Sequence, residues 1–262
     1  MTVPSLAFTE PVGPDTAPLL VLGPSLGTST ILWENVIPAL ARSYRVIAWD
    51  LPGHGASAPA RDPFTVGEIA DAVADAMGSG PDRSFYAGVS LGGAVGLELL
   101  LRHPALVDGA AIVASGAQMG EATAWRERAA QVRAQSTSSV IVASAERWFA
   151  PGSIEREPQL SGRLLHALQD ADDESYALCC EALAEFDVRE RLGEIGAPVL
   201  AAWGEHDAVA PEAKSLEIAF GVRYGTAVRI DAAGHLPPAE CPEATTRAIL
   251  DFFDGLTRME HR

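Results

Sequence analysis

The sequence predicts an α/β fold in which a mainly parallel, doubly wound sheet carries a helical lid insertion. Six short apolar runs, each about the length of a strand and bounded by Gly, Pro, Asp or Ser, alternate with helical patterns along the 262 residues. The runs lack the alternation of a half-exposed strand, which indicates a sheet covered on both faces. A repeated order of strand, loop and helix is typical of parallel sheets with helices on both sides.

The expected elements follow one another from near the N-terminus to the C-terminal helix. The strands are expected at 19–22, 45–49, 84–89, 107–113, 198–203 and 227–230. The helices of the core are expected at 32–42, 66–77, 91–101, 212–220 and 242–256. Because sheets of this kind bind ligands at the carboxyl ends of their strands, the Gly-rich loops that follow the strands should converge on one site.

One segment departs from this alternation of strands and helices. Between about Gln118 and Phe186 no strand pattern occurs, and the chain is rich in Arg, Glu and Ala. We therefore expect a core domain formed by 1–117 and 187–262 and a helical lid formed by 118–186. An insertion between the fourth and fifth strands would cover the carboxyl-end face of the sheet.

The composition excludes several classes of partner. A formal net charge of −16 disfavours nucleic acid and anionic membranes, and no apolar run is long enough to span a bilayer. Cys179, Cys180 and Cys241 fit neither a disulfide framework nor a zinc site. The first arginine is Arg42, so the start of the chain lacks the basic region of a signal peptide. We expect a cytoplasmic protein, either a monomer or a small homo-oligomer.

The strongest chemical motif is Gly88-Val-Ser-Leu-Gly92, which directly follows an apolar run and directly precedes a helical pattern. A sharp turn from strand to helix presents a serine hydroxyl at the top of the sheet, near the positive end of the helix. The flanking glycines remove side chains that would clash in the turn. A chance match in a Gly-rich chain is the alternative, and the strand and helix on either side disfavour it. Ser90 is the predicted nucleophile.

A serine nucleophile needs a base and an acid, which follow it along the chain in the order acid, then histidine. His235 lies in a loop just past the last expected strand, and we predict that it is the base. Asp207 lies one short loop beyond the fifth strand and would orient the imidazole. His206 remains a rival base, and Glu205 and Asp231 remain alternative acids.

An acyl-transfer site also needs two N–H donors for the oxyanion. Leu91, the residue after the nucleophile, is expected to supply one. Leu26, in the loop after the first strand, is the candidate for the other, since Pro24 has no N–H. The sequence contains no phosphate loop, metal motif or dinucleotide fingerprint, so we expect neither a metal nor a cofactor.

Across nearly its whole length the chain resembles the α/β-hydrolase superfamily. The motifs that carry the resemblance are Pro24-Ser-Leu-Gly-Thr28, Asp50-Leu-Pro-Gly-His-Gly55, Gly88-Val-Ser-Leu-Gly-Gly93, Gly204-Glu-His-Asp207 and Gly234-His-Leu236. A closer resemblance is to the 3-oxoadipate enol-lactonases of bacterial aromatic catabolism. It rests on Ser25-Leu-Gly-Thr28 with Trp33, on Trp125-Arg-Glu-Arg-Ala-Ala-Gln-Val-Arg133, on Glu146-Arg-Trp-Phe149 and on Cys179-Cys-Glu-Ala-Leu-Ala-Glu-Phe-Asp187. Pro24 departs from that pattern, in which a polar residue such as Asn is expected.

The enol-lactonase resemblance implies hydrolysis of an unsaturated five-membered lactone that carries a carboxymethyl group, a step of the beta-ketoadipate pathway. Because both this substrate and the protein are negatively charged, a cation is expected in the pocket. Arg128 shares a helix face with Trp125 and would bind the carboxylate, unless it pairs with Glu121 instead. Ser25, Trp125 and Trp148 are the other expected substrate contacts, although lid tryptophans are more often core residues.

Two other hypotheses about the function remain open. The chain could be another serine hydrolase of this fold: a carboxylesterase, a carbon–carbon bond hydrolase or a perhydrolase. It could also be a non-catalytic receptor that keeps a hydrolase shell, because fold does not fix function. Ser90 argues against the dehalogenases and epoxide hydrolases of this fold, which use an aspartate nucleophile.

Overall fold

The computed structural model describes residues 3–78 and 83–260. Within them, six strands form one sheet in the order β2-β1-β3-β4-β5-β6, and every neighbouring pair is parallel. The strands are β1 (Leu19–Gly23), β2 (Arg45–Ala48), β3 (Ser84–Val89), β4 (Gly109–Val113), β5 (Val199–Gly204) and β6 (Gly225–Ile230). The predicted parallel α/β sheet is confirmed.

The register of the sheet brings the predicted site loops together. Gly23, at the end of β1, is paired with Gly88 near the end of β3, so the loops that follow these strands are neighbours. Gly204, at the end of β5, is paired with Ile230 at the end of β6. The loops after four strands therefore open on the same edge of the sheet.

Burial differs between the centre and the edges of the sheet. Every residue of β1, β3, β4 and β5 is buried, as the continuous apolar runs predict. The edge strand β6 leaves most of its residues exposed. The expectation of burial on both faces is wrong for this strand, which is the last in the order of the described strands and is separated from α11 by a groove.

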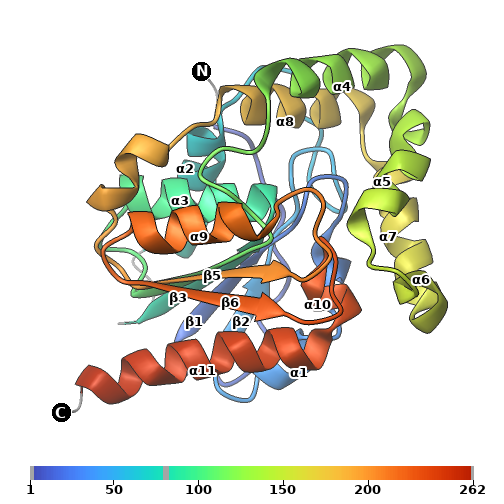
Figure 1. Cartoon of the computed structure of the whole chain (residues 1–262). Helices are drawn as coiled ribbons and strands as arrows, with labels where there is room; N and C mark the ends of the chain where they lie inside the picture. The colour runs from blue at the N-terminus through green and yellow to red at the C-terminus, as the bar shows by residue number, and fades with distance from the viewer. Residues whose placement is uncertain (1–2, 79–82, 261–262) are drawn as a thin grey trace.

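Helices lie on both faces of the sheet (Figure 1), as expected for a doubly wound fold. On one face lie α2 (Val66–Met77), α3 (Leu91–Arg102) and α9 (Glu212–Gly221), and on the other lie α1 (Ile37–Leu40) and α11 (Pro242–Glu260). Two short elements, η3 (Arg189–Glu194) and α10 (Pro237–Glu240), precede β5 and α11. No helix in the described ranges is both long and apolar enough to cross a membrane.

The continuous helix expected at 32–42 is wrong. The chain instead forms a 3₁₀ turn, η1 (Thr30–Trp33), followed by the single helical turn α1. Pro38 lies in the first turn of α1, where a missing N–H is tolerated. Because a proline inside a longer helix would remove a hydrogen bond and clash with the preceding turn, the helix restarts here.

A group of helices lies between β4 and β5, and we call α4 to α8 the inserted helices. They are α4 (Ala122–Gln135), α5 (Ile141–Trp148), α6 (Ser153–Arg156), α7 (Pro158–Asp170) and α8 (Asp173–Glu185), with the 3₁₀ turn η2 (Thr137–Val140) after α4. Figure 1 shows α5, α6 and α7 beyond the arrowheads of β5 and β6, at the carboxyl end of the sheet. An antiparallel bridge between Gln118 and Asp187 joins the two ends of this segment. The division into a core and a lid remains a prediction.

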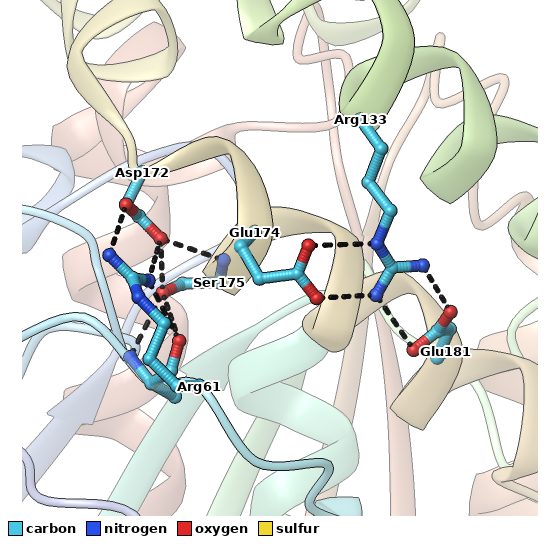
Figure 2. A network of polar contacts seen from close by, with 7 residues as sticks. Arg61, Arg133, Asp172, Glu174, Ser175 and Glu181 are labelled. Atoms are coloured by element: carbon cyan, nitrogen blue, oxygen red, sulfur yellow. Dashed lines mark hydrogen bonds and ion pairs between the residues drawn. The ribbon is translucent and has the colours of Figure 1, made fainter.

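Ion pairs fasten the inserted helices to one another and to the core (Figure 2). Arg133 of α4 pairs with both Glu174 and Glu181 of α8. Arg61, in the loop before α2, donates two hydrogen bonds to Asp172, at 2.7 and 3.1 Å, and thereby holds the pKa of that carboxyl down at about 2. Asp172 also caps α8, so the start of this helix is attached to the core.

Candidate active site

Ser90 lies at the turn between β3 and α3 and has φ 55° and ψ −115°. This conformation is unfavourable for a residue with a side chain and persists only where the surroundings impose it. Two hydrogen bonds do so: the Ser90 N–H donates to Val113 O at 2.9 Å, and Ser115 Oγ donates to Ser90 O at 2.7 Å. The sharp turn predicted from the motif is therefore present, held by the neighbouring strand β4.

Gly88 is needed for the close approach of this turn to its own helix. A Cβ atom at Gly88 would lie 2.3 Å from Gly92 O, inside the shortest real contacts. The Gly92 N–H in turn donates to Pro24 O at 2.9 Å. The serine turn and the loop after β1 are thus in direct backbone contact.

His235 and Asp207 form a buried pair. His235 Nδ1 lies 3.0 Å from Asp207 Oδ2 and 3.1 Å from Oδ1, and the carboxylate also accepts the N–H groups of Val209 and Ala210. Burial raises the pKa of Asp207, but His235 and the two backbone donors outweigh it and leave the pKa below its ordinary value. An ionised carboxylate only accepts hydrogen bonds, so Nδ1 carries the proton and Nε2 is the free ring nitrogen.

The alternative residues lie elsewhere. His206 is exposed and lies 3.8 Å from Glu205. Glu205 accepts the Ala232 N–H, and Asp231 pairs with Arg229 on the surface. The structure therefore brings only Asp207 of the three candidate acids to His235.

Ser90 and His235 share the wall of a small cavity of about 30 Å³. The other lining residues are Ser25, Leu26, Trp125, Arg128, Ser144, Arg147, Trp148, Tyr176 and Val209. All of the predicted substrate contacts are in this list. In the described residues no hydrogen bond joins Ser90 to His235. The volume suits one or two water molecules, so a larger ligand requires the wall to move.

A larger groove of about 650 Å³ lies away from these residues, between β6 and α11. Its charged side chains are Arg229, Asp231, Arg247 and Asp251. It contains no serine, cysteine or histidine, and the chemistry predicted from the sequence lies in the smaller cavity.

Two backbone donors beside Ser90 remain unpaired. The N–H groups of Leu26 and Leu91 have no acceptor within 3–78 and 83–260, whereas the next residue in each case is paired. The Gly27 N–H donates to His54 Nε2 at 3.2 Å, and the Gly92 N–H donates to Pro24. Free donors of this kind suit a developing oxyanion. The Pro24 carbonyl accepts the Gly92 N–H, a bond that a polar residue at this position could also accept through its backbone.

Arg128 is held against the cavity by neutral partners. Its Nε donates to Tyr176 Oη and its Nη2 donates to Ser144 Oγ, both at 2.8 Å. The guanidinium carbon also lies 5.7 Å from the centre of the Tyr176 ring. No carboxylate of the described residues lies within ion-pair distance, so the alternative pairing with Glu121 is not formed.

Four wall residues, Ser144, Arg147, Tyr176 and Val209, were not predicted from the sequence. Ser144, Arg147 and Trp148 share one face of α5, at spacings of three and four. Because Trp148 was a predicted contact, this helical spacing could have pointed to Ser144 and Arg147 as well. Tyr176 reaches the cavity because α8 packs along α4, and no local pattern indicates that contact.

The comparisons with known proteins show the family to which this fold belongs. A family described as the alpha/beta hydrolase fold matches residues 18–240. The chain belongs to the α/β-hydrolase family. This α/β-hydrolase is 34% identical over 233 residues to 3-oxoadipate enol-lactonase 2 of Acinetobacter baylyi, covering 88% of this chain and 87% of the relative.

A solved structure and a second curated relative extend the comparison. The crystal structure of the enol-lactonase from Burkholderia xenovorans has a TM-score of 0.89 at 30% identity, with 95% of this chain and 96% of that chain covered. The pimeloyl-[acyl-carrier protein] methyl ester esterase of Edwardsiella ictaluri is 27% identical, covering 90% of this α/β-hydrolase and 93% of the esterase. The relatives are therefore hydrolases of more than one substrate class.

Proposed function

We propose that this α/β-hydrolase is a serine hydrolase that opens a small carboxylated enol-lactone, converting 3-oxoadipate enol-lactone to 3-oxoadipate. The observation that carries the proposal is the position of Arg128. This cation lies in the wall that Ser90 and His235 share and has no ion-pair partner among the described residues. The similarity to enol-lactonases of two bacteria supports it further.

In the proposed first step, Ser90 Oγ attacks the lactone carbonyl and His235 Nε2 takes its proton. Asp207 keeps Nδ1 protonated and stabilises the imidazolium that forms. The N–H groups of Leu26 and Leu91 hold the oxyanion of the tetrahedral intermediate. Within the described residues, the His235 Nε2 atom and the N–H groups of Leu26 and Leu91 make no other hydrogen bond, so they are available for these roles.

Collapse of the intermediate breaks the ring C–O bond and leaves an acyl-serine. The His235 imidazolium returns its proton to the leaving enolate oxygen, and the resulting enol tautomerises to a ketone, so this step needs less help from a general acid than the expulsion of an amine does. Water then attacks the acyl-enzyme, His235 takes the proton of the water and passes it to Ser90 Oγ, and the carboxylic acid product is released. One water is consumed for each lactone opened.

Arg128 places a positive charge in the cavity wall of a protein whose net charge is negative. With a net charge of −16, the surface repels an anionic substrate in general. A guanidinium whose present partners are hydroxyl groups can accept a carboxylate without breaking an ion pair. Ser25, Trp125 and Trp148 would then form the wall around the lactone ring, after the inserted helices move outward as a lid.

The direct test is hydrolysis of the enol-lactone by the purified protein. The reaction is monitored as the loss of the enol-ester absorbance. Wild type should turn over the lactone, and Ser90→Ala should not. An aryl acetate, a methyl ester, a vinylogous diketone and a peracid-forming assay are run in parallel. No turnover of the lactone above background would overturn the substrate assignment, and the reactive substrate in the panel would replace it.

A carboxylesterase is the second candidate, because methyl ester esterases are also relatives of this chain. Labelling of Ser90 by a fluorophosphonate separates both enzymes from a non-catalytic receptor. An esterase would be labelled and would prefer the neutral ester over the charged lactone. A receptor would bind a ligand tightly without being labelled.

A further inference from the structure

Glu240, at the end of α10, is a buried carboxylate with four hydrogen-bond donors. Its two oxygens divide these donors between two parts of the chain. Oε1 accepts the Ala150 N–H at 2.7 Å and the Ser153 hydroxyl at 2.8 Å. Oε2 accepts the Gly234 N–H at 2.9 Å and the Leu236 N–H at 3.1 Å. One oxygen therefore binds the inserted segment and the other binds the loop that carries His235.

Other contacts join the same two parts. The His235 N–H donates to Trp148 O at 2.8 Å. A Cβ atom at Gly234 would lie 2.7 Å from the Ala150 nitrogen, so only glycine allows this approach. The histidine loop thus packs directly on the backbone of 148–150, the segment that ends α5 and carries Trp148 into the cavity wall.

The bonding pattern fits an ionised carboxylate. All four partners donate, so a proton on either oxygen would meet a donor and break a hydrogen bond. Burial raises the pKa of Glu240, and the four donors counteract part of this effect. No cation of the described residues lies within ion-pair distance. Arg156 donates to Ser153 Oγ at 2.8 Å, and Ser153 in turn donates to Glu240.

We infer that Glu240 is a positioning residue that couples His235 to the wall formed by α5. The inference rests on the proposed catalytic role of Ser90 and His235. Glu240 holds the N–H groups on both sides of His235, and it holds the wall segment with its other oxygen. We expect displacement of the wall to change the position of the base.

A residue that only stabilises the fold and a residue that positions His235 give different results when they are replaced. Loss of a purely stabilising residue lowers the midpoint of thermal unfolding and leaves the reactivity of each folded molecule unchanged. Loss of a positioning residue lowers the rate at which Ser90 reacts, at temperatures well below unfolding. It also lowers kcat more than it changes KM, because the wall residues that touch the substrate are still present.

The test compares wild type with Glu240→Gln, and the exposed Glu243→Gln serves as the matched control. In Glu240→Gln one oxygen becomes an NH₂ group that faces two donors, so the two hydrogen bonds that this oxygen accepted are lost. The rate of Ser90 labelling by a fluorophosphonate should fall at least tenfold in Glu240→Gln and stay within twofold in Glu243→Gln. With an aryl acetate, kcat should fall by a similar factor while KM changes less than threefold. The downfield Nδ1–H resonance of His235 should shift or broaden.

Equal labelling of folded Glu240→Gln and wild type would overturn the inference and leave the proposed function intact. Wild type that is not labelled would overturn the proposed function instead. If Glu240→Gln does not fold, Ser153→Ala is used, since it leaves the carboxylate with three donors. That variant should be labelled two- to fivefold more slowly, and an unchanged rate would overturn the inference.

Discussion

Asp207 Oδ2 lies 3.0 Å from His235 Nδ1, and both side chains are almost completely shielded from solvent, at 0% and 2% exposure. Two backbone N–H groups fix the carboxylate from the other side. The pair is therefore oriented before any ligand arrives, and Nε2 is the ring nitrogen left for chemistry.

Replacing Asp207 by Asn should abolish most of the activity without unfolding the protein. An amide can present an N–H to Nδ1, which favours the tautomer with the proton on Nε2 and removes the base. We expect kcat to fall by about 10³–10⁴-fold, as for other triads of this type, with little change in KM. Aryl ester hydrolysis measures this, and the exposed Asp231→Asn should keep wild-type kcat. A loss of less than tenfold for Asp207→Asn would contradict its proposed role.

Replacing Arg128 by Met should affect charged and neutral substrates differently. A hydrogen bond to a charged group contributes about 1.5–3 kcal/mol, so KM for the carboxylated lactone should rise by about 10–100-fold. The KM for a neutral aryl acetate should stay within threefold. Arg126→Met is the control, because Arg126 is on the same helix but pairs with Glu185 at the surface. Equal effects on both substrates would show that Arg128 supports the wall and does not bind the carboxylate.

Gly88→Ala and Gly162→Ala should change stability in opposite directions. The new Cβ at Gly88 would meet the backbone of Gly92 at 2.3 Å, so we expect a loss of about 1–3 kcal/mol and a large loss of Ser90 reactivity. At Gly162, inside α7, no described atom outside its chain neighbours and the adjacent helix backbone lies within 4 Å of the new Cβ, and alanine should stabilise the helix by about 0.5–1 kcal/mol. Urea unfolding at pH 7 gives both values. A stable, active Gly88→Ala would disprove the close packing of this turn.

His54 should make the protein less stable in mild acid. Burial lowers its pKa from 6.5 in the unfolded chain to about 4 in the folded protein. Between these values the unfolded state binds the extra proton, so stability falls as pH decreases from 6.5 to 4 and is independent of this group above 6.5. The loss over that range is about 3 kcal/mol.

The measurement is the free energy of unfolding in urea at pH 7 and pH 4.5 for wild type and His54→Gln. Other carboxyl and histidine groups titrate in both proteins, so the difference between the two pH dependences isolates His54. The variant should lose less stability than wild type on acidification. Identical losses would mean that His54 is already protonated in the folded state or accessible to water.

Much of the sheet could be predicted because its strands are short, apolar and bounded by turn residues. The range of β3 matches the prediction, and the helix after it begins directly after Ser90, as the motif requires. Chain order also favours Asp207 and His235, because loops after parallel strands meet at one edge. It leaves His206, Glu205 and Asp231 as alternatives, and only the contact between Asp207 and His235 separates this pair from them.

The errors have a different origin. The single turn α1 results from Pro38, a local signal that the apolar spacing of 32–42 concealed. The exposure of β6 depends on its place at the edge of the sheet, and strand order is not a property of any one segment. Tyr176 reaches the site because α8 packs along α4, and Glu240 bonds Ala150 and Ser153, which lie 90 and 87 residues earlier in the chain; local periodicity indicates neither contact.

The bridge between Gln118 and Asp187 brings the point where the chain leaves the core next to the point where it returns. A change in the length of the segment between these residues therefore need not shift the register of the strands. We expect relatives with this fold to differ most within these roughly seventy residues, outside the positions that contact Glu240, His235 and Arg61.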